Sequence, residues 1–169
     1  MENAYKILEY YIDSVDNINL DHKQGMFDMY TDSGFLYGTY RTINYLIEND
    51  VTVYQYILTY EGKYSFSQLF YVPPNGVCHA DDLLYLWNPS FLGPLSGDDL
   101  VVRDVMSSAW TNFAIYGDPT PPGSNLSWTP VDPKSELQNY WNISGTNPTM
   151  ATSHEIHNRM MLWDQIMEK

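Results

Sequence analysis

Cysteine and basic residues are both scarce in this sequence of 169 residues. Cys78 is the only cysteine, so no disulfide can form within the chain, and cysteine usage does not indicate whether the protein resides in an oxidising or a reducing compartment. Eight Lys and Arg residues stand against 21 Asp and Glu residues, which gives a formal net charge of −13. Because nucleic acids and anionic membrane surfaces select for cationic side chains, this balance argues against both as partners.

Several sequence motifs are missing as well. The sequence has no apolar run of membrane-spanning length, no glycine-rich phosphate loop and no EF-hand spacing. No serine lies in a G-x-S-x-G elbow. His154 and His157 stand at a spacing that can hold a metal on a helix, but Glu155 adds no third ligand on that face and no cluster of Cys or Asp follows the pair. We therefore expect neither a metal nor a cofactor.

What is present suits a globular unit with a packed core. Hydrophobic residues make up 44% of the chain, with 15 Tyr and 5 Trp, which favours a sheet-containing interior. Asp32 and Ser33 suggest a break and a helix N-cap, and Ser96 with Asp99 suggests a capping box. Apolar residues at helical spacing predict helices at 3–13, 22–30, 33–48, from Asp81, 96–116 (closed by Gly117), and 154–167.

The strand pattern completes an α/β signature. Val51–Tyr60 is rich in β-branched and aromatic residues and nearly apolar on both faces, as expected of a central strand covered by helices. Gln138–Ile143 alternates enough for a short edge strand. A helix at 33–48 followed by the central strand predicts the α/β class. With no internal repeat and no linker, the sequence is read as one domain or part of one.

One histidine, His79, stands in a stretch typical of a catalytic loop, PPNGVCHADDLLYLW (73–87). The turn Pro73–Gly76 precedes it, and Asp81 and Asp82 follow at once. A carboxylate within one helical turn can orient a histidine as a general base, although the same residues also fit an ordinary helix start. The segment follows the carboxyl end of the central strand, where open α/β sheets place ligand sites. Cys78 is interpreted as a small apolar side chain.

The segment GVCHADDLLYLW resembles the histidine segment of the type-B carboxylesterase (cholinesterase-like) family of α/β-hydrolases, especially its insect members. Five further blocks stand in the same order as in the family, and the resemblance covers Tyr10 to Ile166. They are FDMYTDSGFLYG with VTVYQYILTYEG, then SSAWTNFAIYGDPTPP, the Trp128–Pro130 segment and RMMLWDQI. The chain, 1–169, is similar to the C-terminal third of such a domain, so its N-terminal part is expected to be missing.

The resemblance implies a serine esterase in which His79 is the third member of a Ser–Glu–His triad. The serine and the glutamate would lie upstream of Met1, so the chain is expected to be inactive alone and to need the missing N-terminal part. A small-molecule carboxylic ester would be the substrate. Asp82 matches a family position that is usually acidic and is expected to support His79. Aromatic residues of 64–71 and Trp87 would lie near the substrate pocket.

Two more expectations follow from the family. Asp32 matches an aspartate that pairs with an arginine of the C-terminal helix, and Arg159 is the only arginine there. A non-catalytic adhesion or binding domain remains an alternative function, as does an inactive remnant if Met1 is the true start. A serine elbow upstream would decide for the enzyme. Asn125 and Asn142 stand in N-x-S sequons, which favours a secretory route slightly over the cytoplasm.

Overall fold

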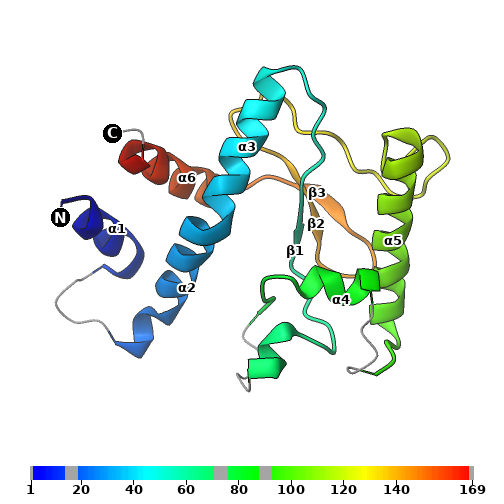
Figure 1. The fold of residues 1–169 in the computed structure, drawn as a ribbon, viewed down its shortest axis with the longest axis horizontal. Coiled ribbons are helices and arrows are strands. Elements are labelled where there is room, and N and C mark those ends of the chain that lie inside the picture. Colours follow the sequence, from blue (N-terminus) through cyan, green and yellow to red (C-terminus); the bar gives the residue numbers. More distant parts are fainter. Residues whose placement is uncertain (1, 14–18, 71–75, 88–92, 168–169) are drawn as a thin grey trace. The chain divides into compact units, whose positions relative to one another are not determined.

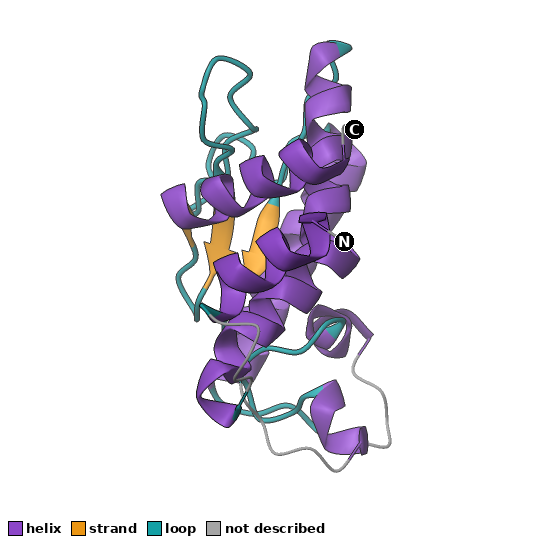
Figure 2. Cartoon of the chain, turned by 90° about the vertical axis from the view of Figure 1, so that its left-hand side faces the viewer, coloured by secondary structure: helices purple, strands orange, loops and turns teal. Residues whose placement is uncertain are grey.

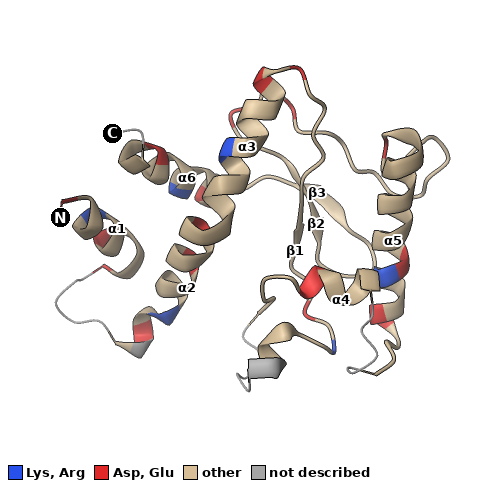
Figure 3. Cartoon of the chain, in the orientation of Figure 1, with Lys and Arg blue, Asp and Glu red and all other residues tan. Residues whose placement is uncertain are grey.

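The computed structural model of the chain describes residues 2–13, 19–70, 76–87 and 93–167 (Figure 1). These residues divide into two compact units that alternate along the sequence. Unit 1 comprises Met1–Val53, Pro133–Gln138 and Ser153–Lys169, and unit 2 comprises Tyr54–Asp132 and Asn139–Thr152. Acidic positions are spread over helices of both units (Figure 3). No helix within the described ranges is long and apolar enough to cross a membrane.

Unit 1 is helical, and its helices confirm the periodicity of the sequence. They are α1 (Glu2–Ile12), α2 (Lys23–Thr31), α3 (Tyr37–Glu48) and α6 (His154–Met167), with a short 3₁₀ turn at Leu20–His22. Apolar residues on one side of these helices supply the core, because burial of amphipathic faces stabilises short helices. The most buried are Ile12, Ile43, Met160 and Trp163.

The expected break at Asp32 and Ser33 is wrong. A π-helical stretch, Asp32–Leu36, joins α2 directly to α3, and no residue there caps a helix with its side chain. Asp32 has helical backbone angles and is fully buried. Its carboxylate binds partners from distant parts of the chain, so it is unavailable as a local cap.

Gly25 allows α1 and α2 to come close together. A Cβ atom at this position would collide with the backbone carbonyl of Tyr11, whose carbon would lie 2.8 Å away. Backbone atoms cannot rotate aside as the end of a long side chain can. Any side chain at residue 25 would therefore force the two helices apart.

Unit 2 contains a three-stranded sheet in the order β1–β2–β3. Its strands, orange in Figure 2, are β1 (Tyr56–Leu58), β2 (Tyr140–Ile143) and β3 (Thr149–Ala151). β1 pairs in parallel with β2, with Tyr56 opposite Trp141, and β2 pairs antiparallel with β3. The expected central strand 51–60 is thus reduced to β1 at the edge of the described sheet, and the expected edge strand at 138–143 is its middle strand, because β3 adds a further pairing that the sequence did not reveal.

Helix α5 (Asp98–Tyr116) packs on this sheet, and α4 (Asp81–Trp87) packs on α5. Trp128 stacks on Trp141 with 4.6 Å between ring centroids, and Val102 and Met106 of α5 are fully buried in the same cluster. A short 3₁₀ helix, Phe66–Phe70, lies in the connection from β1 to α4. This aromatic core holds β1 and α4 in place, and the candidate site lies on the connection between them.

The two ends of α5 show one wrong and one correct prediction. Gly117 closes the helix in the left-handed conformation, and its N–H donates to Phe113 O at 2.8 Å, as predicted. The capping box of Ser96 and Asp99 does not form, because Gly97 occupies the N-cap. The Asp99 carboxylate instead accepts from the Tyr60 hydroxyl at 3.0 Å and approaches the Lys63 N–H at 3.3 Å.

Candidate active site

His79 is an exposed residue on a turn immediately before α4, and its neighbours Cys78 and Ala80 are half-buried. Two backbone hydrogen bonds shape this turn: Asp81 N–H donates to Cys78 O at 3.1 Å, and Leu83 N–H donates to Ala80 O at 2.9 Å. The preceding Gly76 has a positive φ of 85°, while Pro73–Asn75 of the predicted turn lie outside the described residues. An exposed imidazole on a turn is accessible to a substrate, as general-base chemistry requires.

Asp82 connects α4 to strand β1. Its Oδ2 accepts a hydrogen bond of 2.6 Å from the Tyr56 hydroxyl. Burial raises the pKa of Tyr56, and the hydrogen bond to Asp82 raises it further, so the phenol remains a proton donor at neutral pH. The contact that the structure gives Asp82 therefore holds the helix that follows His79 against the strand.

Asp81 is the site residue to which sequence reasoning gave no specific role. It is only 5% exposed, and both of its carboxylate oxygens accept backbone N–H groups, from Phe66 at 2.7 Å and Cys78 at 2.8 Å. The Asp-Asp pair in the sequence signals a helix start, but nothing local indicates which carboxylate turns inward. The one sequence signal for an inward Asp81 is its position three residues after Cys78, the spacing at which a capping-box carboxylate reaches back to a backbone N–H.

Cys78 has the properties of an inert thiol. Burial raises its pKa, and the charge of Asp81 adds to that rise, so the protonated form predominates at neutral pH. A thiol nucleophile needs the opposite shift. Cys78 therefore fits the interpretation of a small apolar side chain beside His79.

An aromatic hollow of about 180 Å³ lies elsewhere in unit 2. Residues from the β1 region, α5 and the proline-rich segment line it, and they include Tyr56, Trp110 and Trp128. None of its lining residues comes from 64–71 or α4, where the sequence placed the substrate pocket. Trp87 is 71% exposed, and Tyr71 lies outside the described residues.

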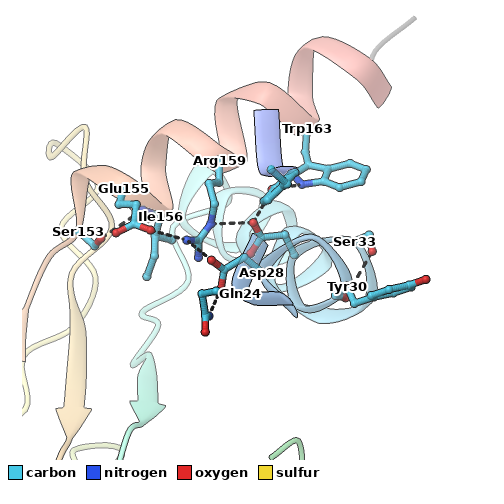
Figure 4. Close-up of polar contacts among 11 residues, drawn as sticks. Gln24, Asp28, Tyr30, Ser33, Ser153, Glu155, Ile156, Arg159 and Trp163 are labelled. Atoms are coloured by element: carbon cyan, nitrogen blue, oxygen red, sulfur yellow. Dashed lines mark hydrogen bonds and ion pairs between the residues drawn. The ribbon is translucent and has the colours of Figure 1, made fainter. Parts of the chain in front are cut away.

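Unit 1 brings Asp32 and Arg159 together, as the family resemblance implied. Figure 4 shows Arg159 of α6 pointing toward Asp28 and Glu155 in the same cluster. Arg159 Nε lies 2.7 Å from Asp32 Oδ2, which also accepts a hydrogen bond of 2.6 Å from the Tyr11 hydroxyl. The Nε–H is not aligned for a hydrogen bond, so the contact with Asp32 is an ion pair. Asp32 Oδ1 has no hydrogen-bond partner among the described residues. The pKa of Asp32 is raised overall, because the effect of burial exceeds the lowering by the Tyr11 hydrogen bond and the Arg159 charge.

Arg159 also meets two other acids, Glu155 at 2.9 Å and Asp28 at 3.8 Å from its Nη1. Trp163 donates its Nε1–H to the Tyr11 hydroxyl at 2.9 Å, which extends the cluster to α1. This network joins α1, α2 and α6 within unit 1. It lies in a different unit from His79 and has the character of a structural tie.

The two sequons have different surroundings. Asn125 is exposed in the irregular segment after α5. Asn142 lies within β2, and its Oδ1 accepts a hydrogen bond of 2.7 Å from the Thr59 hydroxyl. Glycan transfer needs an exposed, flexible acceptor, so Asn125 is the better candidate.

The histidine pair of α6 does not form a metal centre with other residues of the described ranges. His157 Nε2 lies 3.8 Å from Glu136 Oε1, and no group of three or more His, Cys, Asp or Glu side chains is gathered in the part of the chain that the structure describes. The contact with Glu136 is a weak ion pair when the histidine is protonated.

The carboxylesterase family matches residues 2–163. The chain belongs to this family. Juvenile hormone esterase of Tribolium castaneum is 33% identical over 163 residues, which cover 88% of this chain and 28% of that protein. Venom carboxylesterase-6 of Apis mellifera is 26% identical over 161 residues, covering 92% of this chain and 28% of that protein.

The fold agrees with solved carboxylesterases. A crystal structure of juvenile hormone esterase from Manduca sexta, with OTFP covalently attached, superposes on 99% of this chain with a TM-score of 0.79 and 22% identity. The match covers 33% of that chain. The chain thus has part of an α/β-hydrolase fold and spans about a third or less of the length of these carboxylesterases.

Proposed function

We propose that this chain is the C-terminal portion of a serine carboxylic ester hydrolase and that it contributes the catalytic histidine. In this proposal His79 accepts the proton of the serine hydroxyl, returns it to the leaving alcohol, and then activates the water that releases the acyl group. The observation that carries the proposal is the exposed His79 on the turn before α4, within a chain that matches the carboxylesterase family nearly throughout. The substrate class is a small carboxylic ester.

The nucleophile and the triad acid would come from the upstream part of the domain. This sequence has no G-x-S-x-G elbow, and the triad order in this fold places serine and acid before the histidine. The 169-residue chain alone should hydrolyse p-nitrophenyl acetate no faster than an unrelated protein with the same number of histidines. Turnover that a serine-directed inhibitor abolishes would contradict this division of the triad.

The exposed sequon at Asn125 and the venom carboxylesterase among the relatives support a secretory route. We infer that the parent protein enters the secretory pathway and carries its glycan at Asn125. Expression with a signal peptide should then yield a product whose mass falls on treatment with a glycan-removing amidase. Asn125→Gln should abolish that change in mass.

The test of His79 uses a protein in which this chain is joined to the upstream part of a carboxylesterase domain. His79→Gln keeps a side chain of similar size but removes the base, so kcat should fall by about 10⁴–10⁶. Asp82→Asn should cost about tenfold at most, because this residue does not carry the proton. His154→Gln is the matched control, since His154 lies exposed at the start of α6. A His79→Gln enzyme that folds and keeps a tenth of its activity would overturn the proposal.

A further inference from the structure

The two neighbouring carboxylates at the start of α4 bind different parts of unit 2. Asp82 accepts from the Tyr56 side chain on β1. Asp81 accepts from two backbone groups: Oδ1 from Phe66 N–H at 2.7 Å, and Oδ2 from Cys78 N–H at 2.8 Å. Among these contacts, those of Asp81 act directly on the turn that carries His79.

Two hydrogen bonds between Asp81 and Cys78 close a small loop of backbone that contains His79. Asp81 N–H donates to Cys78 O, while the Asp81 side chain accepts from Cys78 N–H, and only His79 and Ala80 lie between the two residues. Ala80 has a φ of 72°, a conformation that residues with a Cβ atom rarely adopt. The shape of the turn therefore depends on its two anchors more than on the local preference of the chain.

The second oxygen of Asp81 attaches this loop to another segment. Phe66 begins the 3₁₀ helix Phe66–Phe70, fifteen residues earlier in the chain. The contact with Cys78, three residues earlier, is that of a capping box, and it involves one carboxylate oxygen. The other oxygen accepts from Phe66 in a separate segment, so the carboxylate ties two loops together.

We propose that Asp81 is a positioning residue that fixes the backbone of the His79 turn, so that the imidazole is held where the reaction needs it. The inference rests on the proposed role of His79 as general base. A general base must stay within hydrogen-bonding reach of the proton it removes. Displacement by about 1 Å can lower the rate by about 10²-fold, so an exposed histidine needs firm anchors.

The main test measures amide hydrogen exchange on the 169-residue chain. In Asp81→Ala both N–H groups lose their acceptor, so exchange at Cys78 and Phe66 should rise by about 10- to 100-fold relative to exchange at Met106, which reports opening of the α5 core. Asp81→Asn keeps one acceptor oxygen and should give intermediate protection. A ring-proton NMR signal of His79 that broadens or shifts in the same variants would report the imidazole directly.

Asp99→Ala is the matched control. Asp99 is as buried as Asp81, at 4% exposed, and also accepts from a loop N–H, but the hydrogen bonds found for it within the described residues go to Tyr60 and Lys63, outside the His79 turn. It should raise exchange at Cys78 and Phe66 no more than at Met106. Equal effects of the Asp81 and Asp99 variants on the turn would overturn the proposal, since they would mark Asp81 as a general stabiliser.

A kinetic measurement separates this inference from the proposed function. In the joined enzyme, Asp81→Asn should lower kcat by about 10- to 100-fold with KM changed by less than about twofold, whereas Asp99→Asn should change neither to that extent. If His79→Gln leaves kcat intact, the proposed function fails even where the exchange result holds. If exchange at Cys78 and Phe66 is unchanged in Asp81→Ala, the positioning role fails whatever His79 does.

Discussion

Asp32 in unit 1 and Asp81 in unit 2 are both buried carboxylates, but they are stabilised in different ways. Asp32 depends on two side chains, the Tyr11 hydroxyl and the Arg159 guanidinium, and its Oδ1 remains without a hydrogen-bond partner among the described residues. Asp81 depends on two backbone N–H groups, one for each oxygen. Side-chain partners can be lost through one substitution, whereas backbone donors are retained by every residue except proline. The buried charge of unit 1 is therefore the more vulnerable.

The largest effect is expected from Arg159→Met, which leaves Asp32 buried without its cation. Such a loss costs about 3–5 kcal/mol of the free energy of unfolding. Arg41→Met provides the control, because the contact of Arg41 with Asp164 in the same unit involves a half-exposed guanidinium and is worth at most about 1 kcal/mol. Urea unfolding followed by tryptophan fluorescence measures both.

A double variant sharpens this result. Asp32→Asn removes the buried charge itself, so Asp32→Asn with Arg159→Met should be more stable than Arg159→Met alone. The coupling energy of the cycle then reports the ion pair. A double variant that loses the full sum of the two single effects would show that Asp32 and Arg159 do not interact.

Two glycines test how closely each unit is packed. Gly25→Ala should cost about 1–3 kcal/mol or more, because its Cβ would strike the Tyr11 backbone, which cannot rotate away. Gly62→Ala in unit 2 should cost less, because the nearest atoms that its Cβ would meet belong to the side chains of Tyr85, Asp99 and Tyr60 and not to the backbone. Thermal unfolding gives the ranking.

Gly38→Ala is the control for both glycines. Gly38 lies in α3 with open space around its Cβ position, so alanine should stabilise the helix by up to about 1 kcal/mol. A Gly25→Ala protein as stable as the Gly38→Ala protein would contradict the close approach of α1 and α2.

The smallest effect is an alkaline loss of stability. Burial, followed by the Asp99 hydrogen bond, raises the pKa of Tyr60 from 10.0 to about 12. Between these two values the unfolded chain has lost the phenolic proton and the folded chain has kept it, so the free energy of unfolding falls as pH rises. Stability from this group is complete below pH 10.0 and is lost as the pH passes about 12.

Tyr60→Phe should make that decline shallower in urea unfolding measured at several pH values between 9 and 12. Tyr116→Phe changes a tyrosine that is 64% exposed on α5 and should leave the slope as it is in the unmodified chain. An unchanged slope in Tyr60→Phe would place the alkaline transition elsewhere, with Tyr11, Tyr54, Tyr56 and Tyr85 as the other phenols whose pKa is raised by burial.

Local periodicity predicted the helices well, and order of motifs predicted the family. The amphipathic patterns of 3–13 and 154–167 match α1 and α6, because burial of one helical face is written directly into residue spacing. The failures concern residues whose partners are distant in sequence. Asp32 resembles an N-cap until Arg159, 127 residues later, is brought beside it. Ser96 and Asp99 fit a capping box, but Tyr60 binds Asp99 instead.

The candidate site divides in the same way. His79 could be chosen from the residues around it and from the family resemblance, and its triad role remains a prediction. The roles of Asp81 and Asp82 could not be separated, because two adjacent acids at a helix start have the same local signature. Their different partners, Phe66 and Tyr56, are fixed by tertiary packing. The order of the strands could not be predicted either, because β3 is only three residues long and has no clear strand pattern in the sequence.

The alternation of the two units along the sequence has a consequence for how the chain folds. Tyr56 on β1 pairs with Trp141 on β2, and Asp32 pairs with Arg159. Neither pair can form until the later residue has been synthesised, so neither unit can complete its core before then. Pairings of such long sequence separation slow folding, because the entropy of loop closure must be lost before the contacts form. During that interval the apolar strand 56–58 and the charge of Asp32 both lack their final partners. A nascent chain that ends before residue 159 should therefore remain protease-sensitive and dependent on chaperones, and it should become resistant once α6 has emerged from the ribosome.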